Sequence, residues 1–175
     1  SNHYLFNEDI YAVYSKLSFS LGKWEGTAGL RYEDSRSEGY SITLDSTNTR
    51  DIKKLFPSAS ISRSLSDALA LSLAYSYRIE RPKFHSLNPF IRYMDPFTLE
   101  KGNPLLRPEL THSAKLSLAY EKQPFFSLEY AHTNNIITLV TEQNEDRQTE
   151  AFDDNLDSYR KIGGSLFFPL SFIPG

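Results

Sequence analysis

The feature that most constrains the fold is the strict alternation of side-chain character between Leu69 and Ile79. Leucine, tyrosine and isoleucine occupy every second position, and alanine, serine and arginine stand between them. Because successive side chains of a strand point to opposite sides of the sheet, this pattern predicts a β-strand with one apolar face. The same period recurs from Leu110 to Tyr120, and we expect both apolar faces on the same side of one antiparallel sheet.

Further alternating runs predict an all-β chain, arranged as an antiparallel up-and-down meander of about seven to eight long strands. The expected strands lie near residues 9–21, 24–34, 52–64, 68–80, 109–121, 125–135 and 159–172. Short turns near residues 22–23, 65–67 and 122–124 alternate with long connections at roughly 34–51, 81–108 and 133–158. This asymmetry is typical of bacterial outer-membrane barrels, whose strands are joined alternately on the two sides of the membrane.

Strand length favours a membrane barrel over a soluble sheet. Runs of about 11 to 13 residues exceed the five or six of ordinary sheets and match the 9 to 11 that cross a bilayer at a tilt. Tyrosine and tryptophan flank the apolar runs, as side chains at the headgroup level do, although tyrosine is also a good strand residue in general. Seven strands are an incomplete set for a closed barrel, so we expect the parent chain to continue beyond this sequence.

Composition excludes several other classes. Aromatic residues make up 14% of the chain, which argues against general disorder. The formal net charge of -3, with no block of basic residues, gives no field for nucleic acid. The chain has no cysteine, and no apolar stretch is long enough for a membrane helix. A helical membrane protein and a nucleic-acid-binding protein are both poor interpretations.

A proline-rich connection carries a family resemblance. It contains Arg-Ile-Glu-Arg-Pro at residues 78–82, Leu-Asn-Pro at 87–89 and Gly-Asn-Pro-Leu-Leu-Arg-Pro-Glu at 102–109. Gly-Leu-Arg-Tyr-Glu at 29–33 and Leu-Phe-Pro-Ser at 55–58 look like strand starts of the same kind. In this order the segments resemble the barrel of TonB-dependent receptors, in particular the related outer membrane protein β-barrel family, and the resemblance covers most of the chain.

The resemblance implies a 22-stranded barrel in the Gram-negative outer membrane, surrounded by lipid. It also implies an amino-terminal plug domain and a TonB-type energy-transducing partner in the full-length protein. Residues 1–175 would then be a fragment of the barrel without the plug. The expected function is uptake of a nutrient whose identity the sequence does not give. A passive or adhesive outer-membrane barrel and a soluble β-sandwich binding module are the alternatives.

Two groups of residues are candidates for function. The prolines stiffen the 81–108 connection because each fixes φ and removes a backbone donor, which suits either a family scaffold or a ligand-facing loop. The loop candidates for ligand contact are His85, Asn88, Tyr93, Phe97 and Asn103. Charged residues at the inward positions of the strands would line a polar lumen or touch the plug. These lumen-facing candidates are Arg31, Glu33, Arg78, Lys115 and Glu129.

The sequence offers no signal for catalysis, a metal or a cofactor. The four histidines lack metal-ligand spacing, and no nucleophile or phosphate-binding motif occurs. Asp153-x-Asn155-x-Asp157 resembles the start of a calcium loop, but the required glycine and terminal glutamate are missing, which favours a solvated loop. We therefore expect no enzyme activity. An isolated fragment with open edges and an apolar face is expected to self-associate.

Overall fold

The computed structural model describes residues 3–43, 45–144 and 147–167. Over these residues the chain forms one sheet of nine strands and one short helix. The seven long strands are β1 (Tyr4–Leu21), β2 (Trp24–Ser41), β3 (Ser46–Ser64), β4 (Leu69–Glu80), β7 (Glu109–Tyr120), β8 (Gln123–Gln143) and β9 (Thr149–Leu166). The helix α1 (Phe84–Leu87) and the short strands β5 (Arg92–Asp95) and β6 (Thr98–Glu100) lie in the connection between β4 and β7.

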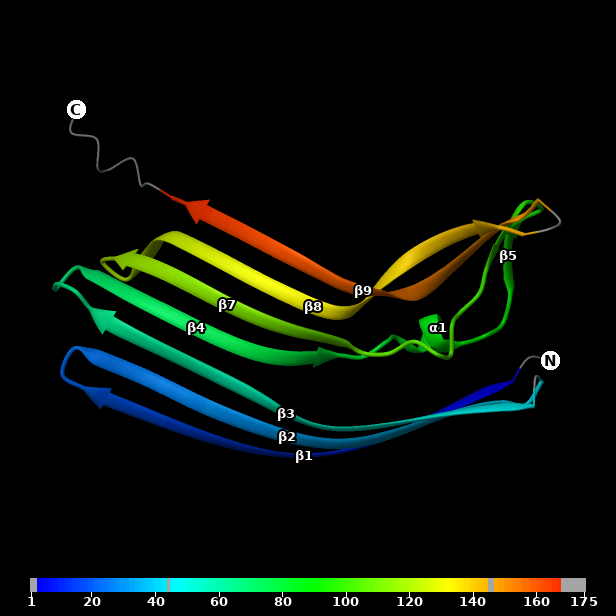
Figure 1. Ribbon diagram of the computed structural model, residues 1–175, viewed down its shortest axis with the longest axis horizontal. Coiled ribbons are helices and arrows are strands. Elements are labelled where there is room, and N and C mark those ends of the chain that lie inside the picture. The colour runs from blue at the N-terminus through cyan, green and yellow to red at the C-terminus, as the bar shows by residue number, and fades with distance from the viewer. Residues whose placement is uncertain (1–2, 44, 145–146, 168–175) are drawn as a thin grey trace.

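The seven long strands follow one another around the sheet, each antiparallel to its neighbours, so the predicted meander is confirmed. Figure 1 shows them as a curved wall. Short turns join β1 to β2, β3 to β4 and β7 to β8 at one end, which we call the short-turn end. The opposite end, the long-loop end, holds the 81–108 connection. Here β6 pairs with β9 in parallel, which the predicted meander did not include.

Two of the three predicted long connections are wrong. Most of residues 34–51 and 133–158 belong to the outer halves of two hairpins, β2–β3 and β8–β9, whose last paired residues are Ser41 with Ser46 and Gln143 with Thr149. The Asp153–Asp157 segment is therefore part of β9 and not a solvated loop. β1 likewise begins at Tyr4 instead of residue 9. The last predicted strand, 159–172, begins earlier, at Thr149, and its residues 168–172 lie outside the described residues.

The sheet divides at the long-loop end. The ladder between β3 and β4 stops at the Ser58–Ser76 pair, whereas β2 and β3 stay paired from Trp24 to Ser41. The residue beyond Ser58 is Pro57, which has no N–H to donate to a ladder. Past this point β1, β2 and β3 form one arm, while β8 and β9 form the other (Figure 1). The 81–108 connection lies between the two arms.

The strand register places two chemically different faces on the sheet. Leu71 pairs with Leu118 and Leu73 with Leu116, so the apolar faces of β4 and β7 coincide, as predicted. We call this side the apolar face. Large apolar side chains on it are widely exposed: Leu17 is 74% exposed and Ile162 is 76% exposed. The other side, the polar face, carries mainly serine, threonine, alanine and charged residues.

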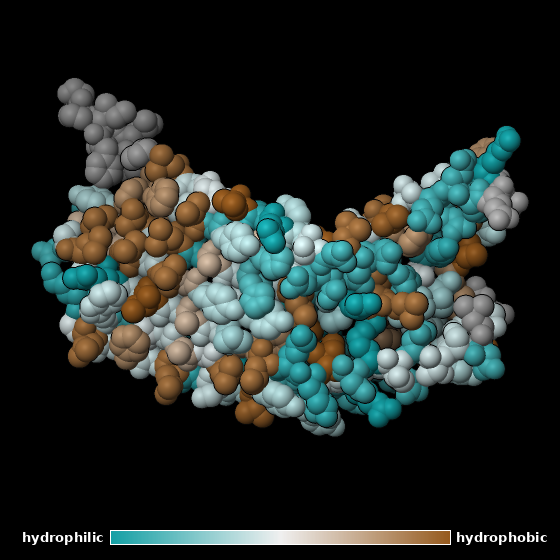
Figure 2. Space-filling model, viewed as in Figure 1, coloured by the Kyte–Doolittle hydropathy of each residue, from teal (hydrophilic) through white to brown (hydrophobic). Residues whose placement is uncertain are grey.

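No second sheet packs on the apolar face within the described part of the chain, so the architecture is not a sandwich. Figure 2 shows the apolar side chains gathered toward the short-turn end and the hydrophilic ones toward the long-loop end. The buried apolar residues are few, namely Phe56, Leu87, Leu99 and Leu106. Three of these four belong to the 81–108 connection, so the core lies where that connection packs on the sheet. Among the described residues, no helix has the length and apolar character needed to span a membrane.

Candidate functional site

The 81–108 connection folds back over the polar face and is fixed at its start by Arg81. The Arg81 guanidinium donates to the Glu33 carboxylate, lies 2.9 Å from Glu8 Oε1 through Nε and donates to Ser35 Oγ at 3.2 Å. Glu33 is fully buried and also pairs with Arg31 at 2.5 Å. A buried carboxylate costs least when it is paired and hydrogen-bonded. Oε1 of Glu33 accepts a hydrogen bond from Arg81, whereas Oε2 forms an ion pair with Arg31 without a hydrogen bond in the described part of the chain.

The helix α1 continues the contact with β1. The ring of Phe84 lies 5.9 Å from the ring of Tyr4 and 6.4 Å from that of Phe6, in tilted and edge-on arrangements that aromatic pairs favour. Leu87, at the end of α1, is 2% exposed. The first half of the connection is therefore packed against the arm that contains β1.

The two motif asparagines hold the connection together. Asn88 Oδ1 accepts the Phe90 N–H at 3.2 Å, and the Gly102 N–H donates to the Asn88 carbonyl at 3.0 Å. A Cβ on Gly102 would lie 2.2 Å from that carbonyl oxygen, so only glycine fits. Asn103 Oδ1 accepts the Leu105 N–H at 3.0 Å. The Leu-Asn-Pro and Gly-Asn-Pro segments thus meet in space.

The second half of the connection is attached to the other arm. β6 adds three residues in parallel to the edge of β9, where Thr98, Leu99 and Glu100 pair with residues 149–151. Lys101 donates to the Glu150 carboxylate and Asn103 Nδ2 donates to Asp154 Oδ1 at 3.2 Å. The hydrogen bond from Lys101 is the main cause of the lowered pKa of Glu150, and Asn144 adds to it. The connection therefore bridges the two arms.

The five predicted loop residues separate into two groups. The side chains of Asn88 and Asn103 form hydrogen bonds within the connection, and Asn103 also donates to β9. These contacts give both asparagines a scaffolding role. His85 on α1, Tyr93 on β5 and Phe97 between β5 and β6 are exposed, with Tyr93 at 67% and Phe97 at 73%. Of the five candidates, these three have exposed side chains at the long-loop end.

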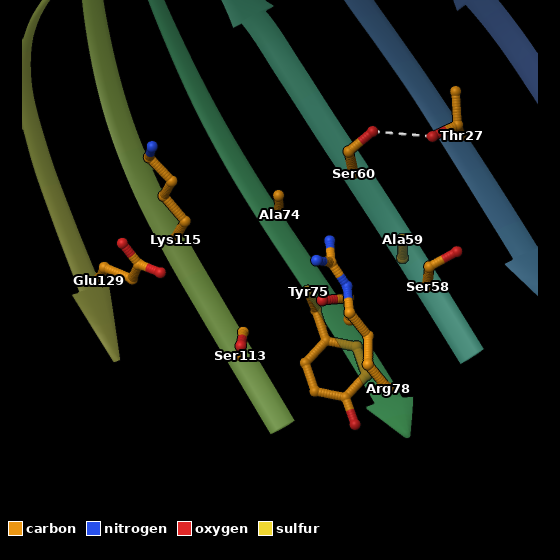
Figure 3. Close-up of a pocket in the computed structure, with 11 residues that line it drawn as sticks. Thr27, Ser58, Ala59, Ser60, Ala74, Tyr75, Arg78, Ser113, Lys115 and Glu129 are labelled. Atoms are coloured by element: carbon orange, nitrogen blue, oxygen red, sulfur yellow. Dashed lines mark hydrogen bonds between the residues drawn. The ribbon is translucent and has the colours of Figure 1, made fainter. Parts of the chain in front are cut away.

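The five predicted lumen-facing charges share the polar face, as the register shows. Arg78, Lys115 and Glu129 line a hollow of about 350 Å³ whose other walls are mainly serine and alanine. Figure 3 shows Lys115 and Glu129, cross-strand partners on β7 and β8, at one side of the hollow, and the Thr27–Ser60 hydrogen bond of 2.8 Å at the other, with Arg78 of β4 between them. Arg31 and Glu33 lie nearer the long-loop end, in the Arg81 cluster.

Several residues of the site could not be found from the sequence. Arg81 stands in the motif, but its partner Glu8 is 73 positions away in an acidic segment of ordinary appearance. Glu150 and Arg50 do not belong to any recognisable sequence motif, so nothing in the sequence singled them out. Among the described residues, no group of three or more histidine, aspartate or glutamate side chains is placed to hold a metal ion.

Comparison with known proteins agrees with this geometry. The OprC copper transporter has a TM-score of 0.66 at 18% identity, and 90% of this chain covers 25% of that one. The hemophore receptor HasR of Serratia marcescens, solved with its hemophore HasA and heme, has a TM-score of 0.68 at 16% identity, with coverages of 90% and 31%. The siderophore receptor PirA of Pseudomonas aeruginosa has a TM-score of 0.54 at 13% identity, with coverages of 94% and 40%.

These likenesses show a shared fold, and the chain spans well under half the length of each of these structures. No curated protein sequence matches the chain. The model of the outer membrane protein beta-barrel family, however, matches residues 1–174. This chain therefore belongs to the outer membrane protein beta-barrel family, whose place is the outer membrane of Gram-negative bacteria, and its fold is that of TonB-dependent receptor barrels.

Proposed function

We propose that this chain is the barrel segment of a TonB-dependent receptor that imports a nutrient, and that it is not an enzyme. The observation that carries the proposal is the 81–108 connection, which folds over the polar face and bridges both arms while leaving aromatic side chains exposed. A connection built this way can meet a ligand at the mouth of a barrel.

The apolar face fits a lipid environment of defined height. On β2 the side chains of the apolar face occupy every second position from Trp24 to Tyr32. This span is nine residues long, which matches the 9 to 11 residues needed to cross a bilayer. β2 as a whole has 18 residues, about twice that number, so its second half extends past the lipid. Because bacterial barrels have short periplasmic turns, the long-loop end faces the outside of the cell.

The polar face fits a lumen closed by a plug domain. Serine and alanine dominate the hollow beside Arg78, Lys115 and Glu129, and such small side chains let another backbone approach closely. In the full-length receptor, a plug would pack on this surface and a TonB-type partner would displace it. Ligand contact is assigned to His85, Tyr93 and Phe97, the three loop candidates with exposed side chains.

Uptake in cells tests the proposal. A strain lacking the gene, complemented with the wild-type gene, is compared for uptake of copper, heme and ferric siderophores. We expect the gene to restore uptake of one of these, and we expect deletion of the energy-transducing partner to abolish that uptake. Uptake that persists without the partner would instead support a passive barrel.

A paired substitution tests the loop assignment. Replacing Tyr93 and Phe97 by serine should lower uptake about tenfold or more, since aromatic anchors dominate recognition surfaces, without changing the amount of receptor in the membrane. Ile42→Ser is the matched control, because Ile42 is 51% exposed at the same end but lies in the β2–β3 turn. An equal loss in both variants would contradict the assignment.

A further inference from the structure

A small cavity lies beneath the 81–108 connection, between it and the arm formed by β1, β2 and β3. Its volume is about 130 Å³. Ser37 and Gly39 of β2 form its floor, Tyr4 and Arg50 stand at its sides, and Leu87 and Pro104 close it from the connection. A Cβ on Gly39 would lie 2.1 Å from Tyr4 Oη, so the absence of a side chain there leaves room for the tyrosine.

The charges around this cavity do not balance. Arg81 and Arg31 pair with Glu8 and Glu33, which uses two positive and two negative groups. Arg50 is the third arginine, and within the described residues no carboxylate comes within ion-pair distance of it. Glu8 lies in the same row of the sheet, with the small Ser37 between them, but it is already bound to Arg81. Among the described residues, the guanidinium of Arg50 is therefore a positive charge without an ion-pair partner.

The surroundings of Arg50 keep its guanidinium available. The residue is partly buried, and burial lowers the pKa of Arg50 while Glu8 and Tyr4 raise it. An arginine remains protonated at neutral pH, and its planar donors match an oxyanion in bidentate geometry. Burial raises the pKa of the Tyr4 phenol, so the hydroxyl stays protonated and can donate. Asn48 adds an amide to the same wall.

Size limits what the cavity can hold. Sites for whole small molecules are commonly about 300 to 1,000 Å³, so this cavity has room for one functional group of a larger ligand. Its donors come from Arg50, Tyr4 and Asn48, and it has no free carboxylate to repel an anion. It lies at the long-loop end, beside the exposed part of the connection.

We propose that Arg50, with Tyr4 and Asn48, forms an anion subsite that binds a carboxylate or phosphate group of the imported ligand. This proposal rests on the proposed function only for the source of that group, because binding of a simple anion does not require transport. The 81–108 connection covers the cavity through Leu87 and Pro104. Because Arg81 fixes the start of this connection on Glu8 and Glu33, it also helps to position the subsite.

Anion binding by the full-length protein in detergent tests the proposal directly. Calorimetric titrations with inorganic phosphate and, separately, with acetate are run on the wild type and on Arg50→Met. We expect saturable binding of at least one anion, weakened about tenfold or more by Arg50→Met, because a charge-assisted contact is lost. Arg50→Lys should lose less, since it keeps the charge but not the bidentate geometry.

The matched control is Arg36→Met. Arg36 is an exposed arginine on neighbouring β2, and the alternation of the strand places it on the opposite face from Ser37. We expect anion binding by this variant to equal that of the wild type. Equal weakening by Arg36→Met and Arg50→Met, or no saturable binding of either anion by the wild type, overturns the subsite.

The comparison of the two anions identifies the group: tighter phosphate binding indicates a phosphate, and tighter acetate binding indicates a carboxylate. Thermal melts of each variant separate lost binding from lost folding, and Arg50→Lys provides the same test if Arg50→Met does not fold. A receptor that imports its nutrient in cells but binds neither anion would contradict the subsite and leave the proposed function standing.

Discussion

Arg81 shows how one side chain can fix a 28-residue connection. Its guanidinium reaches Glu8 on β1 and both Glu33 and Ser35 on β2, while its backbone lies just after β4. The motif that contains Arg81 was recognisable in the sequence, but the residues that it binds were not. Neither Glu8 nor Glu33 could be matched to it without the strand register, because charges on alternating positions look alike whether they meet water or a partner.

Replacing Arg81 by methionine should destabilise the protein. Glu33 is fully buried, and losing one of its two arginines leaves part of a buried charge uncompensated, at a cost of about 2 to 4 kcal/mol. Denaturant unfolding in detergent measures the loss, and Arg107→Met, at an exposed arginine in the same connection, is the control. Adding Glu33→Gln to Arg81→Met should recover part of the stability, and a simple sum of the two losses would contradict this account.

The elements were predictable from the sequence where lipid enforces the pattern. Alternation is clear on β2 up to Tyr32, and the predicted strand ended at residue 34. Beyond this point both faces of β2 are polar, as in Glu33–Gly39, because neither side has to face lipid. The strand continues to Ser41 through backbone pairing with β1 and β3, which leaves no periodic signal. The outer half of β9, which is mostly polar, was missed for the same reason. The outer half of β8 lacks alternation for a different reason, because Ile136, Ile137, Leu139 and Val140 put apolar side chains on both of its faces.

Attachment of β6 to β9 should depend on pH through Glu150. Lys101 and Asn144 hold the pKa of this carboxylate below its ordinary value. A group with a lowered pKa in the folded state stabilises that state above its unfolded pKa, about 4.3, and the contribution is lost as the pH falls through the folded value. Hydrogen-exchange protection of the Lys101 and Thr149 amides, which donate to Ala151 and Phe97 respectively, reports on this attachment.

The comparison variant is Glu150→Gln. At about pH 6 the wild type should protect these two amides more than the variant does. The difference should shrink as the pH falls below the ordinary glutamate pKa of about 4.3 and vanish once Glu150 is protonated. Glu142→Gln, at the cross-strand partner of Glu150 on β8, is the control and should behave as the wild type. A difference between wild type and Glu150→Gln that stays constant with pH would contradict the role given to the carboxylate.

The molecule as a whole has an apolar face that suits contact with lipid and a polar face that suits the lining of a lumen. The two faces follow from the sequence alone, since period-two alternation assigns each residue to a side once the strands pair antiparallel. The path of the 81–108 connection did not follow from it. That path depends on contacts between residues far apart in sequence, such as Asn103 with Asp154, and on the parallel pairing of β6.

An isolated chain of residues 1–175 should not remain a monomer in water. Leu73 is 50% exposed and Tyr75 is 38% exposed on the apolar face, and covering such surface is worth about 25 cal/mol per Å². We expect the chain to need detergent or to form a dimer or larger assembly that buries Leu71, Leu73, Tyr75, Leu116 and Leu118 against a second sheet. Light scattering in detergent-free buffer measures this, and a monodisperse monomer with these side chains solvated would refute it.

The parallel pairing of β6 with residues 149–151 also determines the outline of the barrel rim. Those backbone groups of β9 are already used, so a strand following β9 around the wall can form its ladder only below Ala151. In a closed barrel this pairing would make the wall lower on the far side of the β8–β9 arm, as a notch in the rim. Such a notch would lie beside exposed Tyr93 and Phe97 and would give a bulky molecule a sideways approach to the mouth.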